Sequence, residues 1–334
     1  EERRPRTLAD VSHLFFSGVE ESQEQEGPSR PEAAGAASSG DAPARAPEHE
    51  SVPPPASEHE SDRGPDSAHE RSRVHEPARY VVVTGSTGRP GKSTVAANLA
   101  SAFLTRGRVV LIDADPSIPN ARFFLGFPSW HYLSPLCGGG KPAPGLALES
   151  GLVVADQAAD GRMLDLGSDG RLEVEVQGQD SRTADYAVVD VPLDGLSRVP
   201  AELARGARFV VVARPGWEGF LGAFETLSTL ARRLGVPRAG IVVNGSADYA
   251  QAEEFHAKIH EAARRLLSME TRLMGGIALE PDLGSVQRER GAIVHSRPAA
   301  VSALSLREAA SNVLRYGEPE AEARERPRRH RSVE

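Results

Sequence analysis

Cysteine is nearly absent from this chain. Among 334 residues Cys137 is the single cysteine, so an intrachain disulfide framework is excluded and a reducing compartment is indicated. No apolar run approaches the roughly 20 residues that a membrane span needs, and the N-terminal residues lead into no long apolar stretch, so we expect no signal peptide. The net charge of −8 gives no overall attraction to nucleic acid or anionic lipid. We therefore expect a cytoplasmic protein without a strong membrane or nucleic-acid signal.

Large apolar residues are scarce between Glu20 and Ala78, where Glu, Ser, Pro, Ala and Gly dominate. Such a segment cannot bury enough surface to offset its chain entropy, so residues 20–78 are predicted to be a disordered linker. Residues 1–19 include Thr7–Val19, an apolar island at helical spacing, which predicts a short amphipathic motif. This motif either docks on a protein partner or folds back onto the chain's own domain. Residues 318–334 form a charged, Arg-rich tail.

Residues 79–317 alternate between β-branched runs and helical patterns. This alternation predicts an α/β fold, a doubly wound and mostly parallel sheet with helices on both faces. The predicted strands are Arg79–Gly85, Arg108–Asp115, Tyr186–Val191, Arg208–Arg214 and Ala239–Gly245, with a further candidate at Gly275–Leu279. The predicted helices are Lys92–Arg106, Leu221–Leu234, Ala250–Leu267 and Val301–Tyr316. The shorter alternation between residues 152 and 176 is typical of a hairpin-like insertion.

The segment TGSTGRPGKST joins the first strand to the first helix, which is the context of a phosphate loop. Gly88 and Gly91 allow the backbone to turn tightly. Backbone amides from Gly91 through Thr94 are predicted to face the phosphates of a nucleotide at the start of the helix. We expect Lys92 to reach the β- and γ-phosphate oxygens and Ser93 to hold Mg²⁺.

This loop departs from the usual pattern at two places. Ser86 stands where the pattern has its first glycine, and Pro90 lacks an amide that would otherwise face the phosphates. The alternative interpretation is an ordinary Gly/Pro turn into a helix.

Acidic residues end two of the predicted strands. Asp113 and Asp115 follow one apolar run and Asp190 follows the next, at the sheet edge where open α/β sheets bind ligands. Asp190 is predicted to serve Mg²⁺ or its water, and Asp113 to polarise the attacking water. A helix cap or a turn is the alternative for each. Asn244, at the end of another strand, is placed either to read adenine or to form a turn.

Six segments together resemble the MinD/ParA group of P-loop ATPases, especially its flagellar-placement branch, FlhG. They are GKSTVAANLA, VVLIDADPSIPNARFFLGF, YAVVDVP, VVVARPGWEGFLGAF, IVVNG and EPDLGSVQRERGAIVHSRP, in the family's order. The resemblance implies binding of ATP or ADP with Mg²⁺ and a nucleotide-dependent homodimer whose state is read by membranes, DNA or partner proteins. It implies phosphate contacts for Lys92, Ser93 and Thr94. It implies roles in metal binding and hydrolysis for Asp113, Asp115 and Asp190, and an adenine contact for Asn244.

The family's signature lysine, which reaches the partner subunit's phosphate, is missing. Thr87 takes its place, and the following Gly-Gly has become Gly88-Arg89. Arg89 can substitute as that cation, because a guanidinium suits phosphate. Otherwise the family's dimer is not made, or hydrolysis is poor.

These features predict an ATP-binding, slowly hydrolysing switch that positions or regulates assembly of a cellular structure through partner proteins. One alternative is a nucleotide-binding scaffold that does not hydrolyse. Another alternative is a bacterial tyrosine-autokinase-like transferase. Such kinases usually carry a basic residue soon after the DxD segment and a tyrosine cluster at the C-terminus. Here Ser117 follows the DxD segment and Tyr316 is the single tyrosine near the C-terminus, which argues against this alternative. His256 and His260, four residues apart on a predicted helix, suggest a solvated face rather than a zinc site.

Overall fold

Apolar β-branched runs form the centre of the structure. The computed structural model describes residues 78–86, 89–115, 121, 123–126, 146–148, 150–156, 172–174 and 182–316. The predicted motif at Thr7–Val19, the tail at 318–334 and all of the predicted linker except Ala78 lie outside the described residues.

Within these residues an eight-stranded sheet has the order β10-β9-β8-β1-β7-β2-β4-β3. Neighbouring strands pair in parallel throughout, except that β3 is antiparallel to β4 at one edge. The strands are β1 (Arg79–Gly85), β2 (Val109–Asp113), β3 (Leu146–Ala147), β4 (Val153–Asp156), β7 (Tyr186–Asp190), β8 (Arg208–Ala213), β9 (Arg238–Ser246) and β10 (Glu270–Ala278). The predicted fold class, a doubly wound and mostly parallel α/β sheet, is confirmed.

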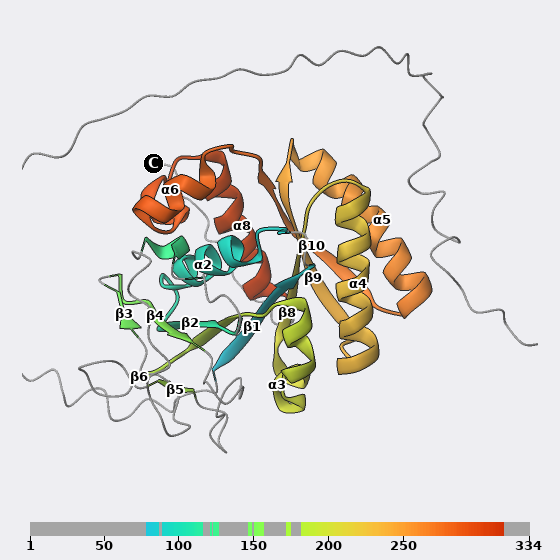
Figure 1. Cartoon of the computed structure of the whole chain (residues 1–334), viewed down its shortest axis with the longest axis horizontal. Coiled ribbons are helices and arrows are strands. Elements are labelled where there is room, and N and C mark those ends of the chain that lie inside the picture. The colour runs from blue at the N-terminus through green and yellow to red at the C-terminus, as the bar shows by residue number, and fades with distance from the viewer. Residues whose placement is uncertain are drawn as a thin grey trace, which may run out of the picture. The chain divides into compact units, whose positions relative to one another are not determined.

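Helices cover both faces of the sheet, as Figure 1 shows. The helices are α2 (Lys92–Phe103), α3 (Ala201–Gly206), α4 (Trp217–Leu234), α5 (Tyr249–Leu267), α6 (Leu283–Arg290), α7 (Ile293–Ser296) and α8 (Val301–Arg315), with 3-10 turns η3 (Phe123–Leu125) and η4 (Leu193–Arg198). Helices α4 and α5 pack together on one face, and α2 and α8 pack together on the other. No helix in the described part is both long and apolar enough to cross a bilayer.

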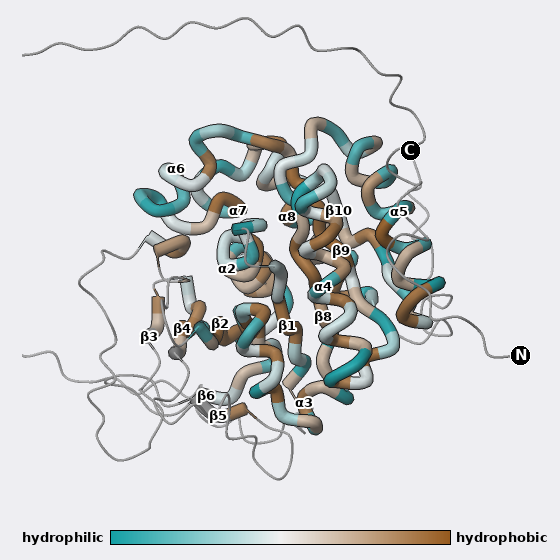
Figure 2. The backbone as a smooth tube through the Cα atoms, turned by 45° about the vertical axis from the view of Figure 1, so that its right-hand side comes forward, coloured by the Kyte–Doolittle hydropathy of each residue, from teal (hydrophilic) through white to brown (hydrophobic). Residues whose placement is uncertain are grey.

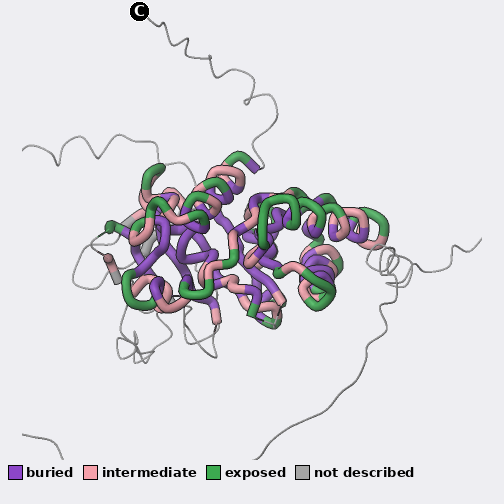
Figure 3. The backbone as a smooth tube through the Cα atoms, turned by 90° about the horizontal axis from the view of Figure 1, so that it is seen from above, coloured by how far each residue is buried: buried purple, intermediate pink, exposed green. Residues whose placement is uncertain are grey.

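Alternating side chains along the central strands supply two separate cores. Val82 belongs to the core beneath α4 and α5, whereas Val81 and Val83 belong to the core beneath α2 and α8. Because both faces are covered, β1 is apolar along nearly its whole length, as parallel strands usually are. Figure 2 shows these strands as a hydrophobic centre, and Figure 3 shows that they are buried between the helical layers.

Two of the predicted regions differ in the structure, and α3, α6 and α7 were not predicted. The last strand is not Gly275–Leu279 but the longer Glu270–Ala278, which lies at the sheet edge. Its first half alternates between exposed and buried residues and so lacks the continuous apolar run on which the prediction depended.

The stretch from 152 to 176 is not simply a hairpin-like insertion. Its first part, β4, is a parallel member of the main sheet and pairs with β2. Its last part, β5 (Glu173–Val174), pairs antiparallel with β6 (Arg182–Thr183) in a separate two-stranded sheet. Short strands such as β4 give too few residues for a pattern to show their partner.

Candidate functional site

The predicted phosphate loop lies between β1 and α2, where the sequence placed it. Gly91 precedes the helix with φ of 89°, a left-handed conformation that favours glycine. A Cβ at Gly91 would also lie 2.2 Å from Nδ2 of Asn244, so a larger residue would be excluded by contact alone. Asn244 donates from Nδ2 to the carbonyl oxygen of Pro90 at 2.8 Å. Asn244 therefore holds the loop in place from the end of β9, 154 residues away in the sequence.

Arg89 is exposed and has φ of 51°, a left-handed conformation that is uncommon for a residue with a side chain. Gly88, predicted to contribute to the turn, and Thr87 lie outside the described residues.

A buried ion pair lies at the start of α2. Nζ of Lys92 is 3.1 Å from Oδ1 of Asp190, and the Asp190 side chain is fully buried. Nζ of Lys92 also donates to Oγ of Ser93 at 3.4 Å, so Lys92 contacts both side chains. Burial raises the pKa of Asp190 above its ordinary value, while Lys92 opposes that rise. Three predicted site residues from two elements thus form one cluster.

The other oxygen of Asp190 marks where this cluster is incomplete. Its Oδ2 is buried and has no hydrogen-bond partner among the residues that the structure describes. The same holds for Oγ1 of Thr84, near the carboxyl end of neighbouring β1. Buried polar atoms are normally paired, so both atoms indicate an absent polar group at this end of the sheet.

Asp113 lies beside Asp190, because the two residues are register partners on β2 and β7. Its Oδ1 accepts the backbone N–H of Asp115 at 3.1 Å, and its Oδ2 accepts that of Ala121 at 2.7 Å. Burial, and then the neighbouring charge of Asp190, raise the pKa of Asp113 to about 7. In this arrangement Asp113 holds the backbone of half-buried Asp115 and of Ala121.

A third strand also ends in an acid at this edge. Asp156, the last residue of β4, is the register partner of Asp113. Asp156 was not among the predicted site residues, because residues 152–176 were predicted to be an insertion. Its signal was available, since VVAD is a short β-branched run that ends in aspartate, like VVLID and YAVVD.

A glycine on α4 makes room for the unusual serine of the phosphate loop. A Cβ added at Gly222 would lie 2.4 Å from both Cβ and Oγ of Ser86. Ser86 was predicted as a departure from the usual loop, whereas Gly222 was not among the predicted residues. A bulky residue where a pattern has glycine signals that a neighbour must be small, although the sequence does not say which neighbour.

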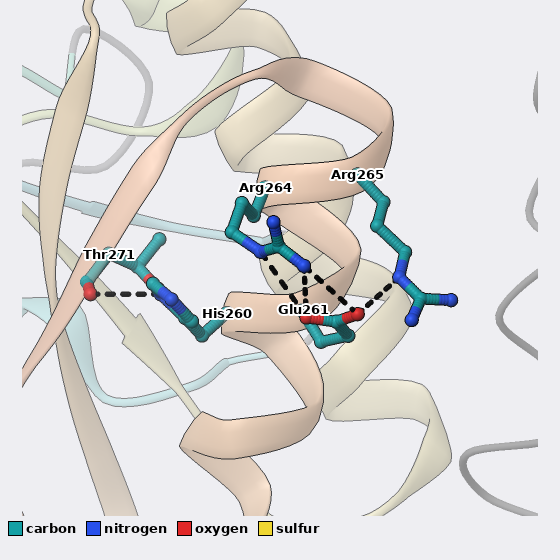
Figure 4. A network of polar contacts seen from close by, with 5 residues as sticks. All are labelled: His260, Glu261, Arg264, Arg265 and Thr271. Atoms are coloured by element: carbon teal, nitrogen blue, oxygen red, sulfur yellow. Dashed lines mark hydrogen bonds and ion pairs between the residues drawn. The ribbon is translucent and has the colours of Figure 1, made fainter.

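The two histidines of α5 lie against β10, so the predicted solvated face is wrong. Nδ1 of His260 lies 3.1 Å from Oγ1 of Thr271 on β10, and Nε2 of His256 lies 3.3 Å from the same hydroxyl. Burial lowers the pKa of His256 to about 4. Figure 4 shows His260 directed toward Thr271, with Glu261 beside it paired to two arginines. The pair packs α5 against β10. No group of three or more His, Cys, Asp or Glu side chains able to hold a metal ion occurs within the described ranges.

The model of the CobQ/CobB/MinD/ParA nucleotide binding domain matches residues 81–289, which is more than half of the chain. The chain belongs to this family. Antiactivator FleN of Pseudomonas aeruginosa is 25% identical over 245 residues, covering 71% of this chain and 86% of FleN. The predicted membership of the MinD/ParA-like P-loop ATPases, near their FlhG branch, is thereby confirmed.

Solved MinD structures have the same fold. The cell division ATPase MinD of Pyrococcus furiosus is 19% identical, with a TM-score of 0.52, covering 71% of this chain and 99% of that one. The septum site-determining protein MinD of Pyrococcus horikoshii, complexed with Mg-ADP, is 19% identical, with a TM-score of 0.51, covering 71% of this chain and 96% of that one. This likeness confirms the P-loop NTPase architecture.

Proposed function

We propose that the chain is a nucleotide-dependent switch that positions or regulates assembly of a cellular structure through partner proteins: it binds Mg-ATP, hydrolyses it slowly and changes its partners with the bound nucleotide. The observation that carries the proposal is the Lys92–Asp190 pair at the start of α2, whose second carboxylate oxygen is buried without a described partner. A cation next to helix amides suits phosphate oxygens, and a carboxylate beside a hydroxyl suits a hydrated divalent ion.

The described residues suit a magnesium nucleotide. Lys92 would bind the β- and γ-phosphates, assisted by the amides from Gly91 through Thr94. Ser93 would hold the metal through its hydroxyl, while Asp190, and in our prediction Asp115, would act on the metal or its waters. Bound Mg²⁺ would supply positive charge that neutralises the phosphate oxygens. The described residues hold no cluster of three ligating side chains. A Mg²⁺ site does not require one, because Mg²⁺ usually takes most of its ligands from phosphate and water.

The adenine contact predicted for Asn244 is compatible with its role in the loop. Its Nδ2 already donates one hydrogen to the carbonyl oxygen of Pro90, and we propose that its Oδ1, the acceptor of the amide, meets the ligand. An amide oxygen accepts from the exocyclic amine of adenine. Guanine presents a carbonyl at the corresponding position, so we expect ATP to bind more tightly than GTP.

The water-activating role predicted for Asp113 stays a prediction. Both of its oxygens accept backbone N–H groups, so its first effect is to order the loop that carries Asp115. The variants Asp113→Asn and Asp115→Asn compare the two carboxylates. If Asp113 activates water, phosphate release falls with ATP affinity unchanged in Asp113→Asn. If it only orders the loop, affinity falls as well.

The nucleotide-dependent homodimer is supported by where apolar side chains are exposed. All large exposed hydrophobic residues in the described part lie at the same end of the sheet as the phosphate loop, near the starts of α4, α5 and α8 or just after β10. They are Trp217, Leu221, Tyr249, Leu279, Val301 and Leu304. An apolar face around a nucleotide edge suits a second copy that closes over it. Exposed Arg89 is the cation that we propose to reach the partner's phosphate.

Light scattering with a non-hydrolysable ATP analogue tests this dimer. We expect a dimer that is weakened in Arg89→Ala, with Arg288→Ala, an exposed arginine on α6, as the matched control. A tight dimer that persists in Arg89→Ala would exclude this role for the arginine.

The central experiment is calorimetry with ATP, ADP and GTP, followed by a phosphate-release assay on the same sample. We expect Mg-ATP to bind to the wild type and to Lys258→Ala, which removes a lysine paired with Glu254 on the surface of α5. Lys92→Ala should not bind. Equal binding by Lys92→Ala would overturn the proposal, whereas tight binding without phosphate release would favour the non-hydrolysing scaffold.

A protein partner and a cytoplasmic location complete the proposal. Thr7–Val19 is the segment that we propose to dock on that partner. Deleting residues 1–18 should leave the melting temperature and ATP binding unchanged while a pull-down loses the partner. A fall of several degrees in melting temperature would instead assign the segment to the chain's own core.

A further inference from the structure

Three neighbouring strands each begin with arginine. They are RYVVVTG, RFVVVA and RAGIVVNGS, the sequences of β1, β8 and β9. Since β9, β8 and β1 are adjacent and parallel, their first residues meet at the amino end of the sheet, opposite the phosphate loop. Helix α3, at the lower edge in Figure 1, ends at this same side.

A cavity of about 440 Å³ lies at this end. Arg79, Arg208 and Arg238 from the strands and Arg205 from α3 line it, and no acidic residue does so among the lining residues that the structure describes. Arg205 is paired with Glu202 at 3.3 Å, on the exposed side of α3. The volume falls within the range of small-ligand sites, roughly 300–1,000 Å³.

Two tyrosines supply the other polar part of the lining. Tyr80 is only 8% exposed, yet its hydroxyl has no hydrogen-bond partner among the described residues. Burial raises the pKa of Tyr80 to about 12, so the hydroxyl keeps its proton and can donate it. The Tyr316 ring lies beneath the Arg238 guanidinium, 5.9 Å from ring centroid to Cζ, and its carbonyl oxygen accepts from Nε of Arg208. These contacts pre-orient two of the arginines.

We propose that this cavity binds a small phosphorylated molecule, up to the size of a mononucleotide. Planar guanidinium groups arriving from several elements match the oxygens of a phosphate group. Tyr80 also lines the cavity, and its buried hydroxyl, which has no partner among the described residues, would turn toward the ligand as a neutral donor. A nucleic-acid duplex can contact exposed arginines, but it cannot enter a cavity to reach a buried hydroxyl. The inference is independent of the nucleotide site, because it uses none of the residues of the phosphate loop.

Calorimetry on the full chain with inorganic phosphate, ribose 5-phosphate and AMP tests the proposal. The three probes separate the contributions of phosphate, sugar and base. We expect at least one to bind, and Arg238→Gln and Tyr80→Phe each to weaken it about tenfold, since hydrogen bonds to charged groups are lost. Arg288→Gln, an exposed arginine on α6, should leave binding unchanged.

A second measurement separates ligand binding from a structural role. Tyr80→Phe should not lower the melting temperature of the free protein, because the hydroxyl gives up no described partner. Binding of the same probe should also persist in Lys92→Ala, which separates this cavity from the phosphate loop. The proposal is overturned if no probe binds at millimolar concentration, or if Arg238→Gln and Tyr80→Phe leave binding unchanged. Duplex DNA binding that depends on Arg238, without binding of any probe, would also overturn it.

Discussion

Three strands at each end of the parallel sheet carry opposite kinds of charge. At the carboxyl end, β7, β2 and β4 finish in Asp190, Asp113 and Asp156. At the amino end, β1, β8 and β9 start with arginine. Asp190 and Asp113 are almost fully buried, and each is bound by Lys92 or by backbone N–H groups. Arg79 and Arg238, in contrast, are exposed.

This difference shows how burial constrains charge. A charge removed from water must be paired or hydrogen-bonded, so the carboxyl end is a tightly coupled cluster in which one change disturbs several groups. Exposed arginines keep their hydration, so the amino end can be altered one residue at a time. We therefore expect substitutions to cost much stability at the first end and little at the second.

The largest effect is expected for Lys92→Ala. The variant should lose ATP binding and about 3–5 kcal/mol of stability, because Asp190 is left buried without its partner. Protonation of Asp190, whose pKa is already raised, brings the loss toward the lower value. Urea unfolding and calorimetry measure the two effects.

The double variant Lys92→Ala/Asp190→Asn is the control for this prediction. It should recover much of the stability, because the buried charge is gone, but not the ATP binding. A double variant as unstable as the single one would show that the pair does not couple in this way.

The second prediction concerns Gly222 at the back of the phosphate loop. Gly222→Ala should cost about 1–3 kcal/mol and weaken nucleotide binding, because its Cβ would meet Ser86 at 2.4 Å. Ser86→Gly in the same chain should restore both. Gly284→Ala on α6 is the matched control, since an added Cβ there meets nothing within 4 Å. Equal behaviour of the two alanine variants would refute the contact.

The third prediction is a pH dependence at the carboxyl end. Asp113 has a pKa of about 7 in the folded protein and 3.8 as its ordinary value. Between these values the folded chain holds a proton that the unfolded chain has released, so the contribution of Asp113 to stability falls as pH rises from about 4 to 7. The slope from one such group is at most about 1.4 kcal/mol per pH unit.

Melting temperatures from pH 4.5 to 7 compare the wild type with Asp113→Asn. The wild type should lose more stability, or gain less, than the variant as pH rises. His256 has a pKa lowered to about 4, so its contribution to stability rises with pH over this range. Because both proteins contain His256, this contribution cancels when their stabilities are compared. Parallel curves would contradict the shifted pKa of Asp113.

The smallest effect is expected for Arg238→Ala at the amino end. The variant loses a cation–π contact with Tyr316, which is worth about 0.5–1 kcal/mol at an exposed site. Thermal unfolding should show no larger change. A loss of 2 kcal/mol or more would make the arginine a structural residue and remove the contrast between the two ends.

Much of the fold was predictable because its strands are buried on both faces. Runs such as YVVVTG and FVVVA predict a buried strand over their whole length. The helical patterns between them indicate the α/β class. The prediction was wrong where a strand is short or covered on one face only, at β4 and in the first half of β10. There the local pattern is too weak to decide between strand, hairpin and loop.

The sequence by itself determined the phosphate loop, because strand, glycines, Lys92 and helix follow one another along the chain. It also indicated strand-end acids, but not that Asp113 and Asp190 are neighbours, since that depends on β7 lying between β1 and β2. Only the tertiary structure decided that Asn244 holds Pro90, that Gly222 makes room for Ser86, and that the strand arginines converge on one cavity. Such contacts join segments far apart in the sequence, and strand order and packing, which no local pattern contains, bring them together.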